Sequence, residues 1–375
     1  MHQCVLCDEP IAAENDSKEH IVPLAVGGHR KVRYFICRDC NNRTGHQWDA
    51  ELAKQFGWFS AVLDIKRESR TPAPKVKITT IDQQEVYLHA GGRLELTRPT
   101  FEDVALPEGG RQVSFRARTE KEAKQILHGL QCKYPEHDFR SIAEGLLIES
   151  KNPGVFKTEF SFGGELAGRS TVKTAIAMAH FMGIPHQQCD YAIHYLRDEG
   201  ATPAFGEFLT RDLVTDRPDS KVFHAVAIAG DPIHKRLFAY VEYFGLARFV
   251  VHLSLGYSGD AIQQSYTFDP TTGEEIELQV DLLSLTDEEH NSVLSNEAAP
   301  NDARVAAFER AMPIVFGVVR AKQDKRAITQ AWEEACVELD LHPDQELDEK
   351  TAKNLALCLT NKLMHHLRHR MRRSH

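Results

Sequence analysis

The sequence predicts an α+β protein of several domains, and three observations lead to this fold class. Two Cys-x-x-Cys pairs lie within the first 40 residues and predict a small module held by a metal ion. Short alternating apolar runs in the middle of the chain predict antiparallel strands, and the pattern from residue 286 onward is helical. A chain of 375 residues can bury several cores. We therefore expect a metal module at 1–55, a helix and connector at 56–75, an α+β body at 76–285 and a helical region at 286–375.

The first cysteine pair is Cys4 and Cys7, and the second is Cys37 and Cys40. Four thiolates at this spacing can close a tetrahedral zinc site, and zinc stabilises a segment too short to build its own core. A purely structural zinc ribbon is the alternative reading. Disulfides are less favoured, because no signal peptide precedes the first cysteine and no apolar run is long enough to span a membrane. We therefore expect a cytoplasmic protein without membrane contact.

The segment between the two pairs contains Glu19-His20-Ile21-Val22-Pro23 and then Gly27-Gly28. Directly after the second pair comes Asn41-Asn42-Arg43-Thr44-Gly45. A carboxylate, an imidazole and an amide are the ligand and base types that a metal-assisted phosphodiesterase needs. A plain zinc ribbon has no need for these three groups together.

Residues 2–55 resemble an HNH endonuclease module of the four-cysteine kind, which has a ββα-metal fold. The resemblance implies a β-hairpin that carries Glu19 and His20, followed by a helix that carries the last metal ligand, Asn41. It also implies one catalytic divalent cation, magnesium or manganese, separate from the structural zinc. The sequence departs from the family in two ways: Glu19 stands where many members have Asp, and residues 30–36 lack the asparagine that usually steadies the base histidine.

The chemistry of each side chain supports these roles. His20 is the natural general base, because an imidazole titrates near neutral pH. Glu19 and Asn41 offer the oxygen donors that a hard cation prefers. On a strand Glu19 and His20 point to opposite faces, so a kink at Pro23 and the two glycines must bring both near one phosphate. Asn42 is an alternative to Asn41 in the metal role. His46 and Asp49 on the same expected helix are further candidate ligands, with a solvated histidine as the alternative for His46.

Basic residues cluster in the same module. We expect them to contact the phosphates of a nucleic acid, with ordinary surface charge as the alternative; they are Arg30, Lys31, Arg33, Arg38 and Arg43. The net charge of −9 argues against a protein that coats nucleic acid, but it is compatible with a nuclease whose basic residues lie on one face.

The region after the module begins with a helix expected at 48–63 and a connector at the prolines of 71–74. Thr119 is expected to cap a second helix. Between these helices four strands are expected, at 75–79, 85–88, 95–96 and 112–116.

A stronger helix is expected at 169–182, where Gly183 and Pro185 end it. Arg169, Lys173 and His180 lie on one of its faces, which we expect to be solvated rather than bound to phosphate. The strands of a meander follow at 222–228, 237–244 and 247–255.

Two histidines of the meander, His224 and His252, are expected to pack inside the sheet. Thr286 and Glu289 have the spacing of a capping box at the start of the helical region. That region ends in a basic tail at 365–375.

The leading functional hypothesis is a metal-dependent HNH endonuclease that acts on double-stranded DNA. Its large body would select the target or sense a signal, as in restriction or anti-phage defence, and the chain would act alone or as a homodimer. One alternative is a zinc-stabilised nucleic-acid-binding protein whose nuclease site is inactive. Another is a small-ligand sensor with a nuclease output.

Overall fold

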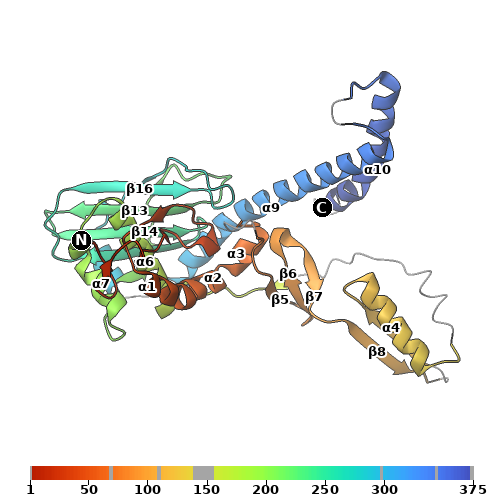
Figure 1. Cartoon of the computed structure of the whole chain (residues 1–375), viewed down its shortest axis with the longest axis horizontal. Helices are drawn as coiled ribbons and strands as arrows, with labels where there is room; N and C mark the ends of the chain where they lie inside the picture. Colours follow the sequence, from red (N-terminus) through yellow and green to blue (C-terminus); the bar gives the residue numbers. More distant parts are fainter. Residues whose placement is uncertain are drawn as a thin grey trace.

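The computed structural model of the protein describes residues 2–66, 71–107, 111–137, 156–295, 299–342 and 345–371. The side chains of residue 111 and of residues 365–371 lie outside this description, and so does the basic tail expected at 365–375. The elements confirm an α+β fold with small antiparallel sheets and a helical C-terminal part. In Figure 1 the largest sheet and the N-terminal segment lie together at one end, and α9 and α10 extend away from them.

The centre of the fold is a five-stranded antiparallel sheet in the order β11-β15-β14-β13-β16. These strands span Phe205–Glu207, Ala247–Ser254, Arg236–Tyr243, His224–Asp231 and Ile262–Phe268, respectively. Side chains of β13 alternate between two hydrophobic cores: Val226 and Ile228 belong to one, Ala225 and Ala227 to the other. Because both faces of the sheet are covered, its middle strands read as almost continuous apolar runs in the sequence.

Helices cover the two faces of this sheet. The helix α6 (Gly164–Phe181) packs on β13, β14 and β15, and α7 (Asp190–Arg197) follows it after the short turn η4 (His186–Cys189). On the other side α8 (Asp287–Leu294) contacts β11 and β15. The small sheet of β12 (Val214–Thr215) and β17 (Gln279–Val280) contributes to the same core as α8.

The N-terminal module consists of two short hairpins and a run of helices. The hairpins pair β1 (His2–Gln3) with β2 (Pro10–Ile11) and β3 (Glu19–His20) with β4 (Lys31–Val32). The helical run comprises α1 (Arg38–Thr44), the π-turn η2 (Gly45–Asp49), α2 (Ala50–Gln55) and α3 (Gly57–Val62). A hairpin followed by a helix is the ββα order that the sequence predicts.

The module shares one hydrophobic core with the body. The Phe56 ring packs on Tyr243 with ring centroids 5.1 Å apart, and Phe59 packs on Phe244 at 5.4 Å. Aromatic side chains bury large apolar areas, so these contacts join the helical run of the module firmly to β14 and the turn after it.

The turn between β3 and β4 needs its two glycines. After the short helix η1 (Leu24–Val26), Gly27 adopts a φ of 100°, which L side chains rarely take. A Cβ on Gly28 would lie 1.7 Å from the carbonyl oxygen of Val22, and one on Gly27 would lie 2.8 Å from Pro270. The turn therefore closes the hairpin tightly and presses it against the body.

A second group of elements lies between the module and α6 in the sequence. Its four-stranded sheet has the order β10-β5-β6-β7, formed by Phe156–Lys157, Val76–Thr80, Glu85–Leu88 and Leu94–Leu96. The short turn η3 (Ala90–Gly92) links β6 to β7. The strand expected at 112–116 belongs to β9 (Arg111–Arg116), which pairs with β8 (Thr100–Ala105) in a separate hairpin. Thr119 caps α4 (Glu120–Lys133) as expected, because its hydroxyl accepts the Glu122 N–H at 3.2 Å.

The C-terminal region is helical, as predicted. The capping box at the start of α8 is complete, since Thr286 Oγ1 accepts the Glu289 N–H and Glu289 Oε2 accepts the Thr286 N–H. The long helix α9 (Asn301–Glu338) is anchored to the module where Lys322 Nζ donates to the Leu63 carbonyl oxygen at 2.7 Å. The last helix, α10 (Glu349–Met371), packs on α9 and forms an ion pair between Lys362 and Glu338 at 3.0 Å.

The expectation of a solvated face on α6 is wrong. Arg169 and Lys173 are only 2% and 1% exposed, and His180 is half-buried with its Nε2 at 2.9 Å from the Arg33 carbonyl oxygen. The reason is that the sheet covers one side of α6 and the N-terminal module covers the other. The polar face of this helix is therefore an internal interface.

Two buried histidines make the fold sensitive to acid. His224 bridges body and module, because its Nε2 lies 2.8 Å from the Val26 carbonyl oxygen and its Nδ1 accepts the Phe244 N–H at 3.0 Å. His252 has no hydrogen-bond partner for either ring nitrogen among the described residues. Burial lowers the pKa of His224 to about 4 and that of His252 to about 3. Both pack inside the sheet, as expected.

We expect the free energy of unfolding to fall as the pH drops below about 6.5, the usual pKa of histidine in an unfolded chain. Below that pH the unfolded chain binds a proton at each position and the folded chain does not, so each histidine costs about 2 kcal/mol at pH 5. Urea denaturation at pH 7 and pH 5, with zinc content measured at both, checks this. A His252→Leu variant should lose stability less steeply with acid, and an equal slope would contradict the prediction.

Candidate active site

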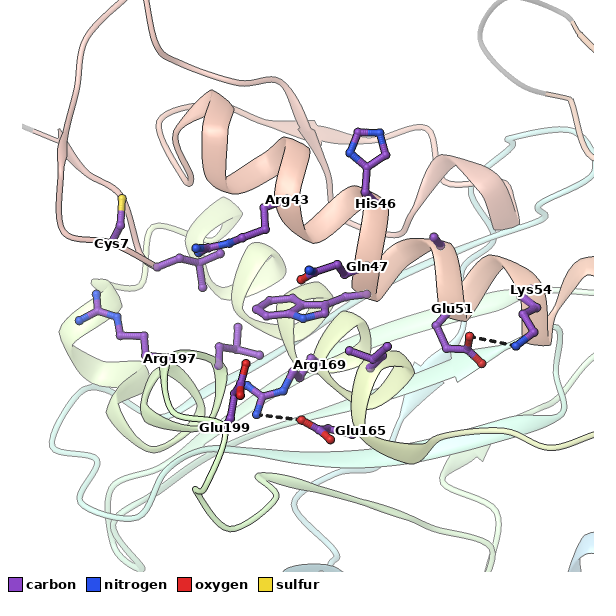
Figure 2. A pocket seen from close by; sticks show the side chains of 15 residues that line it. Cys7, Arg43, His46, Gln47, Glu51, Lys54, Glu165, Arg169, Arg197 and Glu199 are labelled. Carbon is purple, nitrogen blue, oxygen red and sulfur yellow. Dashed lines mark hydrogen bonds and ion pairs between the residues drawn. The ribbon is translucent and has the colours of Figure 1, made fainter.

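A cavity of about 860 Å³ lies between the helical run of the module and the helices α6 and α7. Its walls carry both charges: Arg43 and Lys54 come from the module, whereas Arg197, Glu165 and Glu199 come from the body. At its base the buried Arg169 guanidinium donates to the carbonyl oxygens of Tyr195 at 2.6 Å and Asp198 at 3.2 Å. Figure 2 shows these charged side chains around the cavity, which Trp48 also lines. The groove therefore runs along the surface where module and body meet.

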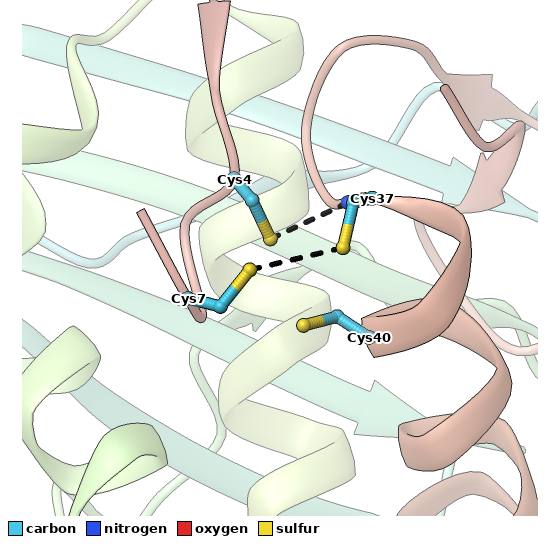
Figure 3. Close-up of side chains that lie close together, drawn as sticks. All are labelled: Cys4, Cys7, Cys37 and Cys40. Carbon is cyan, nitrogen blue, oxygen red and sulfur yellow. Dashed lines mark hydrogen bonds between the residues drawn. The ribbon is translucent and has the colours of Figure 1, made fainter. Parts of the chain in front are cut away.

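The four cysteines of the module meet at one point next to this cavity, as Figure 3 shows. All four sulfur atoms lie within 4.8 Å of one another, and Cys7 Sγ is 3.8 Å from Cys37 Sγ. Tetrahedral zinc with bonds of about 2.3 Å places its sulfur ligands about 3.8 Å apart, so the cluster fits zinc. It is the only cluster of three or more His, Cys, Asp or Glu ligands among the described residues.

Backbone groups support this cluster. Cys37 is the N-cap residue of α1, and its N–H donates to Cys4 Sγ at 3.3 Å. Burial opposes the charged thiolate of Cys4, but this N–H and its neighbours outweigh burial and lower the pKa of Cys4. Burial raises the pKa of Cys7 and of Cys40, so a bound cation is needed to hold all four sulfurs as thiolates. The four cysteines are therefore a structural zinc site that ties the N-terminal loop to the start of α1.

Glu19 and His20 lie side by side on β3, where Glu19 pairs with Val32 and His20 with Lys31. Glu19 is only 4% exposed and is directed inward, whereas His20 is half-buried. The Glu19 Oε1 atom accepts a hydrogen bond from Lys173 Nζ at 2.6 Å. The side chains of β3 therefore alternate between its two faces, as in a regular strand, so the Glu19 carboxylate and the His20 imidazole have different surroundings.

Lys173 also contacts the helical run of the module. Its Nζ donates to Asp49 Oδ2 at 2.6 Å and lies 3.5 Å from Thr44 Oγ1. The second carboxylate oxygen of Asp49 accepts from Ser170 Oγ at 2.6 Å. Asp49 ends the π-turn η2, a one-residue widening of the helix of the kind that often occurs at functional sites. The result is a buried cluster of one ammonium and two carboxylates.

The charges in this cluster are strongly coupled. Burial raises the pKa of Glu19, and Lys173 offsets this effect only in part. Burial also opposes the charge on Lys173, but Asp49 and Glu19 outweigh it and raise the pKa of Lys173. Lys173 therefore carries its proton at neutral pH. With both carboxylates ionised, the cluster has a net charge of −1 and favours cations.

The remaining candidate ligands lie on the same helical run. Asn41 is half-buried on α1, and its side-chain amide makes no hydrogen bond with the described residues. It lies one helical turn before Thr44, so both are on the same face of α1. His46 is exposed at the rim of the cavity, and Figure 2 shows its ring directed away from the other labelled side chains.

The five basic residues have different environments. Arg30 stacks on Tyr266, with its guanidinium 4.1 Å from the ring centre, and pairs with Glu275. Arg33 donates to Asp16 Oδ2 at 2.7 Å. Both therefore make folding contacts that the sequence did not reveal. Lys31 is half-buried; Arg38 and Arg43 are exposed, and Arg43 borders the cavity.

The comparisons with known proteins identify the module. Residues 4–57 match the model of a family described as HNH endonuclease. No curated protein and no solved structure matches the chain. Within the described residues, every helix is too short or too polar to cross a membrane. The N-terminal segment is therefore an HNH-type nuclease module with a zinc site.

Proposed function

We propose that the protein is a metal-dependent endonuclease that hydrolyses phosphodiester bonds in double-stranded DNA. The observation that carries the proposal is the match of residues 4–57 to the HNH endonuclease family, together with the four-cysteine cluster in the same segment. A fold can host more than one function, so the activity depends on the side chains of the site.

His20 is the proposed general base, which takes a proton from the attacking water. Glu19 and Asn41 are the residues that would hold the catalytic ion. Both side chains offer an oxygen atom that suits a hard cation. Among the described residues, no group donates a hydrogen bond to Glu19 Oε2, and the side-chain amide of Asn41 makes no hydrogen bond. A bound magnesium or manganese ion supplies positive charge for the pentacovalent phosphate and the leaving oxygen. His46 remains a weaker candidate ligand, because its ring is directed away from the cavity.

We propose that the exposed Arg38 and Arg43 contact phosphates, with lesser contributions from Lys31, Arg30 and Arg33. The body would then select the target or sense a signal, in the manner of a restriction or anti-phage effector acting in the cytoplasm. A homodimer would supply two sites for the two strands. Ile328 and Trp332, one turn apart on α9 and 56% and 49% exposed, are consistent with such an assembly.

One observation favours a second candidate function. Glu19 is buried and paired with Lys173, which is the arrangement expected of a nucleic-acid-binding protein whose nuclease site is inactive. Incubating the purified protein with supercoiled plasmid, single-stranded DNA and RNA separates the two. Magnesium-dependent cleavage that EDTA stops supports the nuclease; binding without cleavage in magnesium and in manganese supports the inactive alternative.

Asn41→Ala should raise the magnesium concentration needed for half-maximal cleavage by about 10-fold or more, because the ion loses one oxygen ligand. Binding of DNA in calcium should change little. The matched control is Asp39→Ala, which removes an exposed oxygen-bearing side chain from the same helix α1. Titration of the cleavage rate with magnesium measures the effect. If Asn41→Ala and the parent protein need the same magnesium, the ligand must be sought at Asn42, His46 or Asp49.

A further inference from the structure

Lys173 is a buried cation on the body helix α6 that contacts the nuclease module. Its Nζ lies 2.6 Å from both Glu19 Oε1 and Asp49 Oδ2. The ammonium is 1% exposed, so it does not reach a substrate phosphate in this structure. Any contribution of Lys173 to the reaction must therefore pass through the groups that it contacts, Glu19 and Asp49.

The helix that carries Lys173 is fixed in place. All residues from Ala167 to Ala179 are buried, and the helix contacts three strands of the central sheet as well as β3, β4 and η2 of the module. Withdrawing α6 would expose this whole surface. The contact between Lys173 and Glu19 is therefore a permanent part of the folded protein rather than a movable latch.

The surroundings of Lys173 fix its position from two sides. Asp49 uses one oxygen for Lys173 and the other for Ser170, the residue one turn earlier on α6. Thr44 approaches from α1. Lys173 in turn engages only the Oε1 atom of Glu19, and it leaves Oε2 without a donor among the described residues.

We propose that Lys173 is a positioning residue of the nuclease site, which holds Glu19 Oε1 so that Oε2 is presented to the divalent ion. The inference rests on the proposed function. A glutamate has one more rotatable bond than the aspartate common at this position in HNH modules, so it needs an extra restraint to be a precise ligand. Hydrogen bonds to a ligating carboxylate are a known means of orienting it.

The charge of the cluster fits the same role. One ammonium between two carboxylates leaves a net charge of −1, which attracts a cation while the ammonium prevents the two carboxylates from repelling each other. The nuclease module therefore depends on the body: residues 4–57 contain the ligands, but α6 supplies the group that orients one of them.

The test measures manganese binding by electron paramagnetic resonance, on the full zinc-loaded chain without nucleic acid. Lys173→Met should weaken manganese binding by about 10- to 100-fold relative to the parent protein, and raise the manganese needed for cleavage by a similar factor. The matched control is Arg248→Met, which removes a buried cation paired with Glu242 and Asp212 on the sheet face away from α6. The control should bind manganese like the parent, even if it is less stable.

Lys173→Met also leaves two carboxylates facing each other and can fail to fold. The double variant Lys173→Met/Asp49→Asn removes that repulsion, keeps the net charge of −1 and still lacks the bond to Glu19, so it should show the same loss. Unchanged binding in a folded variant would overturn the positioning role. Tighter binding would also overturn it and would mean that the ammonium competes with the ion. A parent protein that neither binds manganese nor cleaves DNA would instead refute the proposed function, and this inference with it.

Discussion

Replacing His20 with alanine is expected to lower the rate of DNA cleavage by about 10²–10⁴-fold, the usual cost of losing a general base. Water is a poor nucleophile until a base removes its proton, and imidazole is the side chain best suited to do so near neutral pH. The variant should retain its fold and its zinc, because His20 is half-buried on a two-residue strand and none of the four cysteines depends on it.

Conversion of supercoiled plasmid to nicked and linear forms in magnesium measures this rate. The matched control is His29→Ala, which removes an exposed histidine from the same β3–β4 turn. It should cleave at the parent rate. A His20→Ala protein that nicks plasmid as fast as the parent would remove His20 from the mechanism, and attention would turn to the other polar groups of the module.

The parts of the fold that the sequence predicts are those set by neighbouring residues. The Cys-x-x-Cys spacing places two thiols on one loop and two at the start of α1, and the structure brings all four together. The caps at Thr119 and Thr286 depend on a hydroxyl and a backbone N–H three residues away. Such contacts can be predicted from the sequence because the two residues that make each contact lie within one helical turn of each other.

The buried cluster of Glu19, Asp49 and Lys173 could not be predicted in the same way. Lys173 is 154 positions from Glu19 and 124 from Asp49 in the sequence, and no local pattern around Lys173 marks it as the partner of either carboxylate. From the sequence alone, the polar face of α6 is expected to contact solvent, because the sequence does not show that the N-terminal module packs on it. A charge becomes internal only when another part of the chain brings an opposite charge, which is a property of the tertiary fold.

Several strands of the structure were not expected from the sequence, and β16 and β8 illustrate a different reason. The strand β16 (Ile262–Phe268) lies at the edge of the central sheet, and its first residue is followed by the polar run Gln263-Gln264-Ser265. The strand β8 is almost wholly exposed. An edge strand pairs with one neighbour only and exposes more of its residues to solvent. Its sequence therefore contains fewer apolar residues, and the apolar pattern that predicted the middle strands is weak in it.

Replacing Cys37 with serine is expected to unfold the N-terminal module and to remove the bound zinc. Structural zinc contributes about 10–16 kcal/mol of apparent binding free energy in small zinc domains, comparable to or larger than the about 5–15 kcal/mol that stabilises a typical domain. The substitution keeps the backbone N–H that donates to Cys4 but removes Cys37 Sγ, which lies 3.8 Å from Cys7 Sγ, so only three of the four thiolates remain for the zinc. Because the module and the body share one core, the damage should extend to the contacts of Phe56 and Phe59 with the sheet.

Elemental analysis should find one zinc per parent chain and little in the variant, and proteolysis should cut the variant first within residues 2–62. Cys132→Ser, at an exposed cysteine on α4, is the matched control and should keep its zinc. Freshly purified parent protein without zinc would show that the four thiols hold the module together in some other way.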